Sequence, residues 1–196
     1  MQMSHIEYNR WDVAEKAKYM KWIPGGARRI LDIGCGRGEF LSLLSGKYEG
    51  YGCDKDEECV RLSSRFGECK VAEIGNLASI YREETFDLVT AFHVLEHLEC
   101  PLAGLHDMRL ITRGYLLLAV PHARFLCSEE RDSHLYSWNE YSLRHLVREG
   151  GFLAVRMTSD RVNIFPRWLR LSPVLNRIIL YLVAAPNELI LLAKKR

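Results

Sequence analysis

Three glycines, Gly34, Gly36 and Gly38, alternate with Cys35 and Arg37 between an apolar run typical of a strand and a segment typical of a helix. Glycine lets the backbone take positive φ, and it lets a ligand approach where a Cβ would clash. The helix that follows directs free N–H groups at whatever lies on the turn. The pattern predicts a nucleotide-type binding turn, although glycine turns also close ordinary βα units.

Two aspartates accompany this turn. Asp32 comes just before the glycines, where a carboxylate repels phosphate but suits an ammonium group. Asp54 ends the next predicted strand, where a carboxylate can accept hydrogen bonds from both ribose hydroxyls. Asp56 is the expected cap of the helix after it, which leaves Asp54 available. The spacing G-x-G-x-G differs from the dinucleotide G-x-G-x-x-G, and no P-loop Lys-Ser/Thr follows. These residues favour a nucleoside that carries an amino acid over a dinucleotide.

Predicted strands and helices alternate along the chain. Apolar runs predict strands at 30–33, 48–54, 69–73, 85–92, 114–120, 152–157 and 188–193, and helical spacing predicts helices at 11–23, 39–44, 56–66, 77–81, 102–110, 139–149 and 163–184. Such alternation, without repeats or a break in composition, predicts one α/β domain with a doubly wound sheet. Its ligand should lie at the carboxyl ends of the strands, which brings Glu73 and Phe92-His93 to the same crevice as the glycine turn.

Composition is that of an ordinary soluble globular domain. The chain has 196 residues, of which 48% are hydrophobic and 27% charged, and a net charge of +2 calls for no nucleic-acid partner. Its six cysteines show no C-x-x-C pair, which favours reduced thiols. The polar N-terminus is not a signal peptide, and no apolar run is long enough to span a membrane. We therefore expect a cytoplasmic protein.

Four segments together, LDIGCGRGEFL, YGCDKD, FDLVTAFHVLEHLECP and LLLAVPH, resemble the successive motifs of class I S-adenosylmethionine-dependent methyltransferases. The resemblance extends from about residue 8 to the C-terminus, and the small-molecule enzymes, including quinone-ring O-methyltransferases, form the most similar subgroup. It implies a Rossmann-like sheet of seven strands, with an antiparallel last strand inserted beside the sixth. The cofactor it implies is S-adenosylmethionine.

The resemblance also implies where the methionine and ribose parts of this cofactor bind. Asp32 and Gly34–Gly36 would hold the methionine, with Gly38 completing the turn, and Asp54 would hold the ribose. Tyr8 and Trp11 precede the first strand and would close over the cofactor as a lid, or else pack against the sheet.

The same resemblance implies which residues contact the adenine and the sulfonium of the cofactor. Lys55 and Ile74 would flank the adenine, and Glu73 would lie near its amino group. Phe92 and His93 would approach the sulfonium through backbone and ring.

The catalytic residues are not implied by the fold, because methyl transfer requires alignment above all and a base only for a poor nucleophile. His122, after the fifth strand, and His134, in the polar loop that follows it, are the candidates for a base or acceptor contact. His93, Glu96 and His97 share the spacing of one helix face and a place used for metal in quinone O-methyltransferases. Because the usual first glutamate is His93 here, we expect no metal and a bracing role for Glu96 and His97.

The chain is predicted to form a single methyltransferase domain over residues 1–196, with residues 1–26 as an N-terminal helical cover and 161–186 as a helical insertion before the last strand. An apolar stripe in 167–183 favours packing on the sheet, and the alternatives are a lid or a membrane contact. The oligomeric state is left open.

The favoured function is methyl transfer to a small-molecule acceptor, with oxygen as a candidate atom and no nucleic acid expected. The alternatives are a non-catalytic cofactor-binding partner subunit and, less favoured, an NAD-dependent oxidoreductase.

Overall fold

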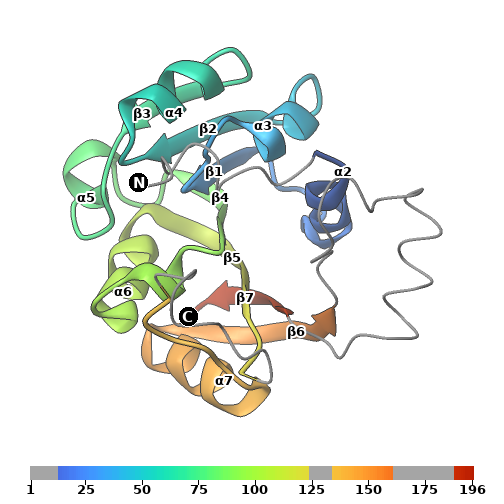
Figure 1. Cartoon of the computed structure of the whole chain (residues 1–196), viewed down its shortest axis with the longest axis vertical. Helices are drawn as coiled ribbons and strands as arrows, with labels where there is room; N and C mark the ends of the chain where they lie inside the picture. Colours follow the sequence, from blue (N-terminus) through green and yellow to red (C-terminus); the bar gives the residue numbers. More distant parts are fainter. Residues whose placement is uncertain (1–12, 124–133, 161–187) are drawn as a thin grey trace, which may run out of the picture.

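Seven strands form the core of the structure, a computed structural model that describes residues 13–123, 134–160 and 188–196. The strands are β1 (Arg29–Ile33), β2 (Glu49–Asp54), β3 (Glu68–Val71), β4 (Phe86–Phe92), β5 (Thr112–Pro121), β6 (Phe152–Asp160) and β7 (Glu188–Lys195). They make one sheet in the order β3-β2-β1-β4-β5-β7-β6 (Figure 1). β7 pairs antiparallel with both β5 and β6, and the remaining pairs are parallel. The predicted seven-stranded sheet with an antiparallel last strand is confirmed.

Helices cover both faces of this sheet (Figure 1). One core cluster joins the sheet to α5 (Leu77–Ile80), α6 (Pro101–Ile111) and α7 (Glu140–Glu149). The other joins it to the 3₁₀-helix η1 (Ala17–Trp22), which follows α2 (Val13–Lys16), and to α3 (Glu39–Leu44). α4 (Glu57–Ser63) follows β2, and the short 3₁₀-helix η2 (Leu95–His97) follows β4.

The central strands are apolar on both faces because both faces are covered. Leu116–Val120 of β5 and most of β7 are fully buried, as parallel-type sheets between two helix layers require. Local signals set the ends of the helices. Asp56 caps α4 by accepting from the backbone of Glu58 and Cys59, and Asn139 starts α7 with a capping box.

Several boundaries differ from the prediction. The first helix is shorter than 11–23 in its α-helical part, because residues 17–22 continue it as a 3₁₀-helix. β3 ends at Val71, so Glu73 lies in the following loop, and β6 continues to Asp160 because it pairs with β7 along its whole length.

Two predicted segments lie wholly or partly beyond the part of the chain that the structure describes. Tyr8, Trp11 and residues 161–186, with the stripe at 167–183, are outside it. Of the predicted cover over 1–26, residues 13–22 form α2 and η1, and Tyr19 and Trp22 are buried against the sheet. In the described ranges no helix has the length and apolar character to cross a membrane.

Candidate active site

The glycine turn joins β1 to α3 at the carboxyl edge of the sheet. Gly34, Gly36 and Gly38 have φ of 67°, 53° and 87°, a region that side chains other than glycine rarely adopt. A Cβ on Gly34 would also lie 2.7 Å from Cγ2 of Val94. The N–H groups of Gly34 and Cys35 donate to the carbonyl of Cys53, at 2.8 and 3.0 Å, which holds the turn against β2. The geometry therefore requires glycine where the sequence has it.

Asp32 lies buried at the mouth of this turn. Thr90 of β4 donates its hydroxyl to Oδ1 of Asp32 at 2.7 Å. Burial raises the pKa of Asp32 to about 6, although the ammonium of Lys16 and the Thr90 hydroxyl act in the opposite direction. Lys16 comes from α2 and is itself buried, with its Nζ 4.9 Å from the centroid of the Phe92 ring. The carboxylate is thus poorly solvated, and an ammonium ligand would stabilise its charged form.

Asp54 lies next to the turn at the end of β2. Its Oδ2 accepts from the N–H of Gly36 at 3.0 Å, and its Oδ1 accepts from the N–H of Asp56 at 3.1 Å. Asp56 caps α4 as expected, but Asp54 is not without protein partners, since it ties the two βα turns together. Each carboxylate oxygen has a second lone pair, so both can still accept from ribose hydroxyls.

The residues predicted for the adenine end lie on the loops after β2 and β3. Lys55 and Glu73 are exposed, and Ile74 is half-buried against the core. Asp107 of α6 holds this loop by accepting from the N–H groups of Gly75 and Leu77, at 2.7 and 3.0 Å. Ile74 therefore has a fixed place at this edge of the sheet.

Phe92 is the last residue of β4, and His93 follows it directly. The Phe92 ring stacks on Tyr19 at 4.0 Å between centroids and meets the Phe40 ring edge-on at 4.9 Å. That ring therefore packs between α3 and the N-terminal helices. His93 has φ of 58°, and its N–H donates to the carbonyl of Ala119 at 2.8 Å. A non-glycine residue in this conformation stores strain of about 1–3 kcal/mol, which is characteristic of functional sites.

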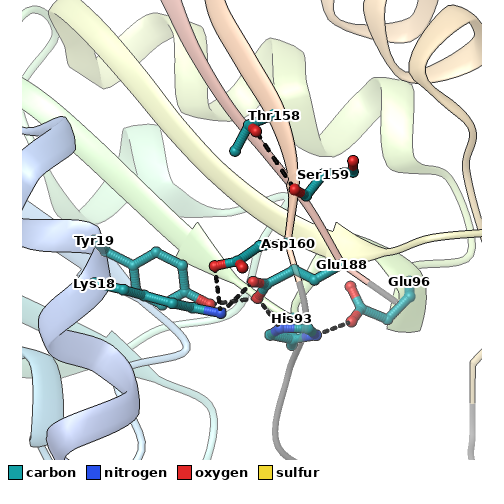
Figure 2. A network of polar contacts seen from close by, with 8 residues as sticks. All are labelled: Lys18, Tyr19, His93, Glu96, Thr158, Ser159, Asp160 and Glu188. Carbon is teal, nitrogen blue, oxygen red and sulfur yellow. Dashed lines mark hydrogen bonds and ion pairs between the residues drawn. The ribbon is translucent and has the colours of Figure 1, made fainter. Parts of the chain in front are cut away.

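The His93 ring lies between two buried carboxylates (Figure 2). Nδ1 is 3.1 Å from Oε1 of Glu96, and Nε2 is 2.9 Å from Oε1 of Glu188. Burial alone would lower the pKa of His93, but the hydrogen bonds to Glu188 and Glu96 raise it to about 9. Burial alone would raise the pKa of Glu188, but His93 and Lys18 lower it to about 2. His93 is therefore an imidazolium at neutral pH.

Glu188, the first residue of β7, is the centre of a wider network (Figure 2). It accepts from the hydroxyl of Tyr19 and from the ammonium of Lys18, both on η1. Lys18 also lies 3.5 Å from Oδ2 of Asp160, the last residue of β6. This network joins the N-terminal helices, β4 and β7 at the crevice.

Sequence reasoning missed Lys16, Lys18, Tyr19 and Glu188. A signal for Glu188 was present: an antiparallel strand begins at the edge where its parallel neighbours end, so an acid at its start faces the crevice. The three N-terminal residues carried no comparable signal, since they look like the polar and apolar faces of an ordinary helix.

The predicted catalytic histidines lie in different surroundings. His122 is buried, and its Nε2 is 3.6 Å from Oε2 of Glu140 at the start of α7. His134 is half-buried beside His97, with 4.8 Å between ring centroids. The structure therefore brings His134 to the loop after β4, next to Glu96, and directs His122 toward α7.

The fold and this edge of the sheet define the class: a Rossmann-like domain of the class I methyltransferase type. The chain belongs to the family described as "Methyltransferase domain", which matches residues 9–157. The predicted class and the predicted cofactor of that class, S-adenosylmethionine, are both confirmed.

Solved structures share the fold over nearly the whole chain. A methyltransferase from Archaeoglobus fulgidus, described as dependent on S-adenosylmethionine, has a TM-score of 0.72 and 24% identity, covering 96% of this chain and 97% of that one. Magnesium protoporphyrin IX methyltransferase from Synechocystis, with bound S-adenosylmethionine, has a TM-score of 0.65 and 16% identity, covering 100% of this chain and 86% of that one.

Curated relatives are distant in sequence. A Geobacillus protein named as a methyltransferase is 27% identical over 74% of this chain and 67% of its own length. The tRNA (carboxymethyluridine(34)-5-O)-methyltransferase of Arabidopsis thaliana is 29% identical over 83% of this chain. The match spans only 39% of the plant protein's length, well under half.

Proposed function

We propose that this chain transfers the methyl group of S-adenosylmethionine to a small-molecule acceptor, with oxygen as the atom methylated. The observation that supports the proposal most is the buried Asp32 carboxylate beside three glycines of positive φ. That pairing suits a ligand with an ammonium group, and family membership supports the methyl donor.

Each part of the donor has a matching group on the chain. Asp32 and the turn Gly34–Gly36 would bind the methionine part, and Asp54 would accept from the ribose hydroxyls. Ile74 and Lys55 would flank the adenine, with Glu73 near its amino group.

The reaction is a displacement at a sulfonium, so positive charge disperses as the methyl group moves. The chain's main task is to align the nucleophile with the methyl–sulfur bond and to exclude water. In this proposal, His93 and the backbone around it lie next to the sulfonium of the bound donor. The carboxylates of Glu96 and Glu188 offset the charge of the His93 imidazolium, which would otherwise oppose a sulfonium nearby. His134 remains the candidate acceptor contact, and His122 is the weaker one because it contacts α7.

Calorimetry tests the donor site directly. S-adenosylmethionine and its demethylated product should bind, and NAD should not. Asp32→Asn and Asp54→Asn should each weaken binding at least about tenfold, since each removes a charge-assisted contact of about 1.5–3 kcal/mol. Glu58→Gln, at an exposed ion pair with Arg61, is the matched control. Binding of NAD with indifference to S-adenosylmethionine would reject the proposal in favour of an oxidoreductase.

Transfer of a labelled methyl group tests catalysis and acceptor class. The screen should compare phenols, catechols and other small hydroxyl compounds with tRNA, because the Arabidopsis relative is named for tRNA. Labelled small molecules would support the proposal. Label found in tRNA alone would reject a small-molecule acceptor in favour of tRNA. Donor binding without any transfer would favour the non-catalytic partner subunit.

A further inference from the structure

Three potential metal ligands from two separate segments meet beside the crevice. Glu96 and His97 belong to η2, and His134 belongs to the segment that leads to α7. One donor atom from each lies within 4.8 Å of the donor atoms of the other two. The two segments are fixed to each other, because the N–H of Leu135 donates to the carbonyl of Glu96 at 2.7 Å.

One oxygen of Glu96 points to a ligand. The residue is fully buried, and Oε1 is engaged by His93. Oε2 is also buried, and it has no hydrogen-bond partner in the described part of the chain. Leaving such an oxygen unsatisfied costs about 1–3 kcal/mol or more. Two imidazoles beside the same carboxylate are the groups that would complete a cation's ligand set.

His93 is not available as a ligand, although its spacing from Glu96 and His97 first suggested it. Both of its ring nitrogens contact carboxylate oxygens, at 3.1 and 2.9 Å. Its contact with Oε1 instead orients Glu96, whose Oε2 is left without a hydrogen-bond partner among the described residues. Residues that orient a metal ligand in this way are a regular part of metal sites.

We propose that Glu96, His97 and His134 bind a divalent transition-metal cation, with Zn²⁺ preferred over Mg²⁺. Two imidazoles and one carboxylate suit zinc and its neighbours, whereas Mg²⁺ selects oxygen ligands. Donors of a tetrahedral zinc site lie about 3.4 Å apart, from bond lengths of about 2.1 Å, so the three side chains would close by about 1 Å on binding. His97 is exposed, so a side of the site is open to water or to an acceptor.

The location suggests what the cation would do if the proposed function holds. An acceptor hydroxyl bound to it would lose its proton to solvent more readily, as metal-bound water does. The oxygen would then form its bond to the methyl carbon while the carbon–sulfur bond breaks and its electron pair remains on sulfur. His134 would thus hold the acceptor through the cation, which removes the need for a separate base.

Zinc binding to the full chain, without donor or acceptor, tests the site itself. After dialysis against EDTA, titration with ZnCl₂ should give one equivalent bound per chain. Glu96→Gln and His134→Ala should each weaken binding at least about tenfold, and His145→Ala, an exposed histidine of α7, should not change it. Titration with MgCl₂ should show binding at least about tenfold weaker than zinc.

Circular dichroism and donor binding show whether each variant is folded, and His134→Ala keeps the test valid if Glu96→Gln does not fold. Equal zinc affinity in wild type and His134→Ala, or equal affinity for zinc and magnesium, would overturn the proposal. Zinc bound through these residues in a chain that transfers no methyl group would support the site and reject the proposed function. Methyl transfer that continues unchanged in EDTA, together with zinc binding unaffected by the variants, would support the proposed function and reject the metal site.

Discussion

Replacing Glu188 with Gln tests whether the buried network stabilises the fold. Glutamine keeps the size of the side chain and an acceptor oxygen for Tyr19, but it removes the negative charge that faces Lys18 and His93. Removing one partner of a buried ion pair costs about 3–5 kcal/mol. The lower end applies here, because His93 still contacts Glu96 and Lys18 still lies 3.5 Å from Asp160. We expect a loss of about 3 kcal/mol.

Urea unfolding at pH 7.5 with EDTA measures this change. With an m-value of about 2 kcal/mol per M, the midpoint should fall by about 1.5 M. Glu84→Gln is the matched control, since Glu84 pairs with Lys195 at 3.1 Å with 65% of its side chain exposed. Its loss should be less than about 1 kcal/mol.

A double-mutant cycle separates the ion pair from a change in packing. Lys18→Met and Glu188→Gln should couple by at least about 1 kcal/mol, because each removes a partner of the other. A loss at Glu188 no larger than at Glu84, or strict additivity with Lys18→Met, would refute the reasoning.

Three further predictions concern other parts of the site. Burial raises the pKa of Asp32 to about 6, and an ammonium ligand needs the carboxylate form, so protons compete with the donor. The calorimetric affinity for S-adenosylmethionine should therefore fall by up to about tenfold per pH unit below pH 6, and Asp32→Asn should abolish this pH dependence. Gly38→Ala should lower the free energy of unfolding in urea more than Gly46→Ala does. Both glycines have positive φ, which costs an alanine about 1–2 kcal/mol. Of the two, only Gly38 would also bring the new Cβ against backbone, 3.0 Å from Cα of Ser63. Hydrogen bonding with a neighbouring thiol lowers the pKa of Cys69 to about 7, whereas burial raises the pKa of Cys53 to about 12. Iodoacetamide followed by mass spectrometry should therefore find Cys69 modified before Cys53, and the opposite order of these two would contradict this.

Local patterns were enough to predict most of the fold. The predicted helix at 39–44 has the bounds of α3, and the bounds of each predicted strand agree with the observed strand within a few residues. Apolar runs and glycine or proline stops act locally, so they can be recognised in the sequence. The direction and place of β7 came from family resemblance, since no feature of an apolar strand states which neighbours it will pair with.

The residues proposed for the donor side could be placed at one edge of the sheet from sequence, because they follow strand ends at short range. The Glu188 network was not, since its members are brought together only by the final sheet order. The histidines show the same limit: spacing suggested His93 as a partner of His97, whereas the structure engages His93 with Glu188 and brings His134 to His97.

The position of β7 has a consequence for the order in which this molecule folds. Tyr19 and Glu188 are 169 residues apart in the chain, and β7 must insert between two strands made earlier. A nascent chain can pair strands β1 through β5 and shape its glycine turn, but Lys18 and His93 lack the carboxylate they share until residue 188 has left the ribosome. Before then only Asp160 and Glu96 face these two cations. Closure of such distant contacts is slow and comes late. An incomplete chain is thus left with unbalanced buried charge and an open sheet edge, features that would mark it for chaperones and proteases.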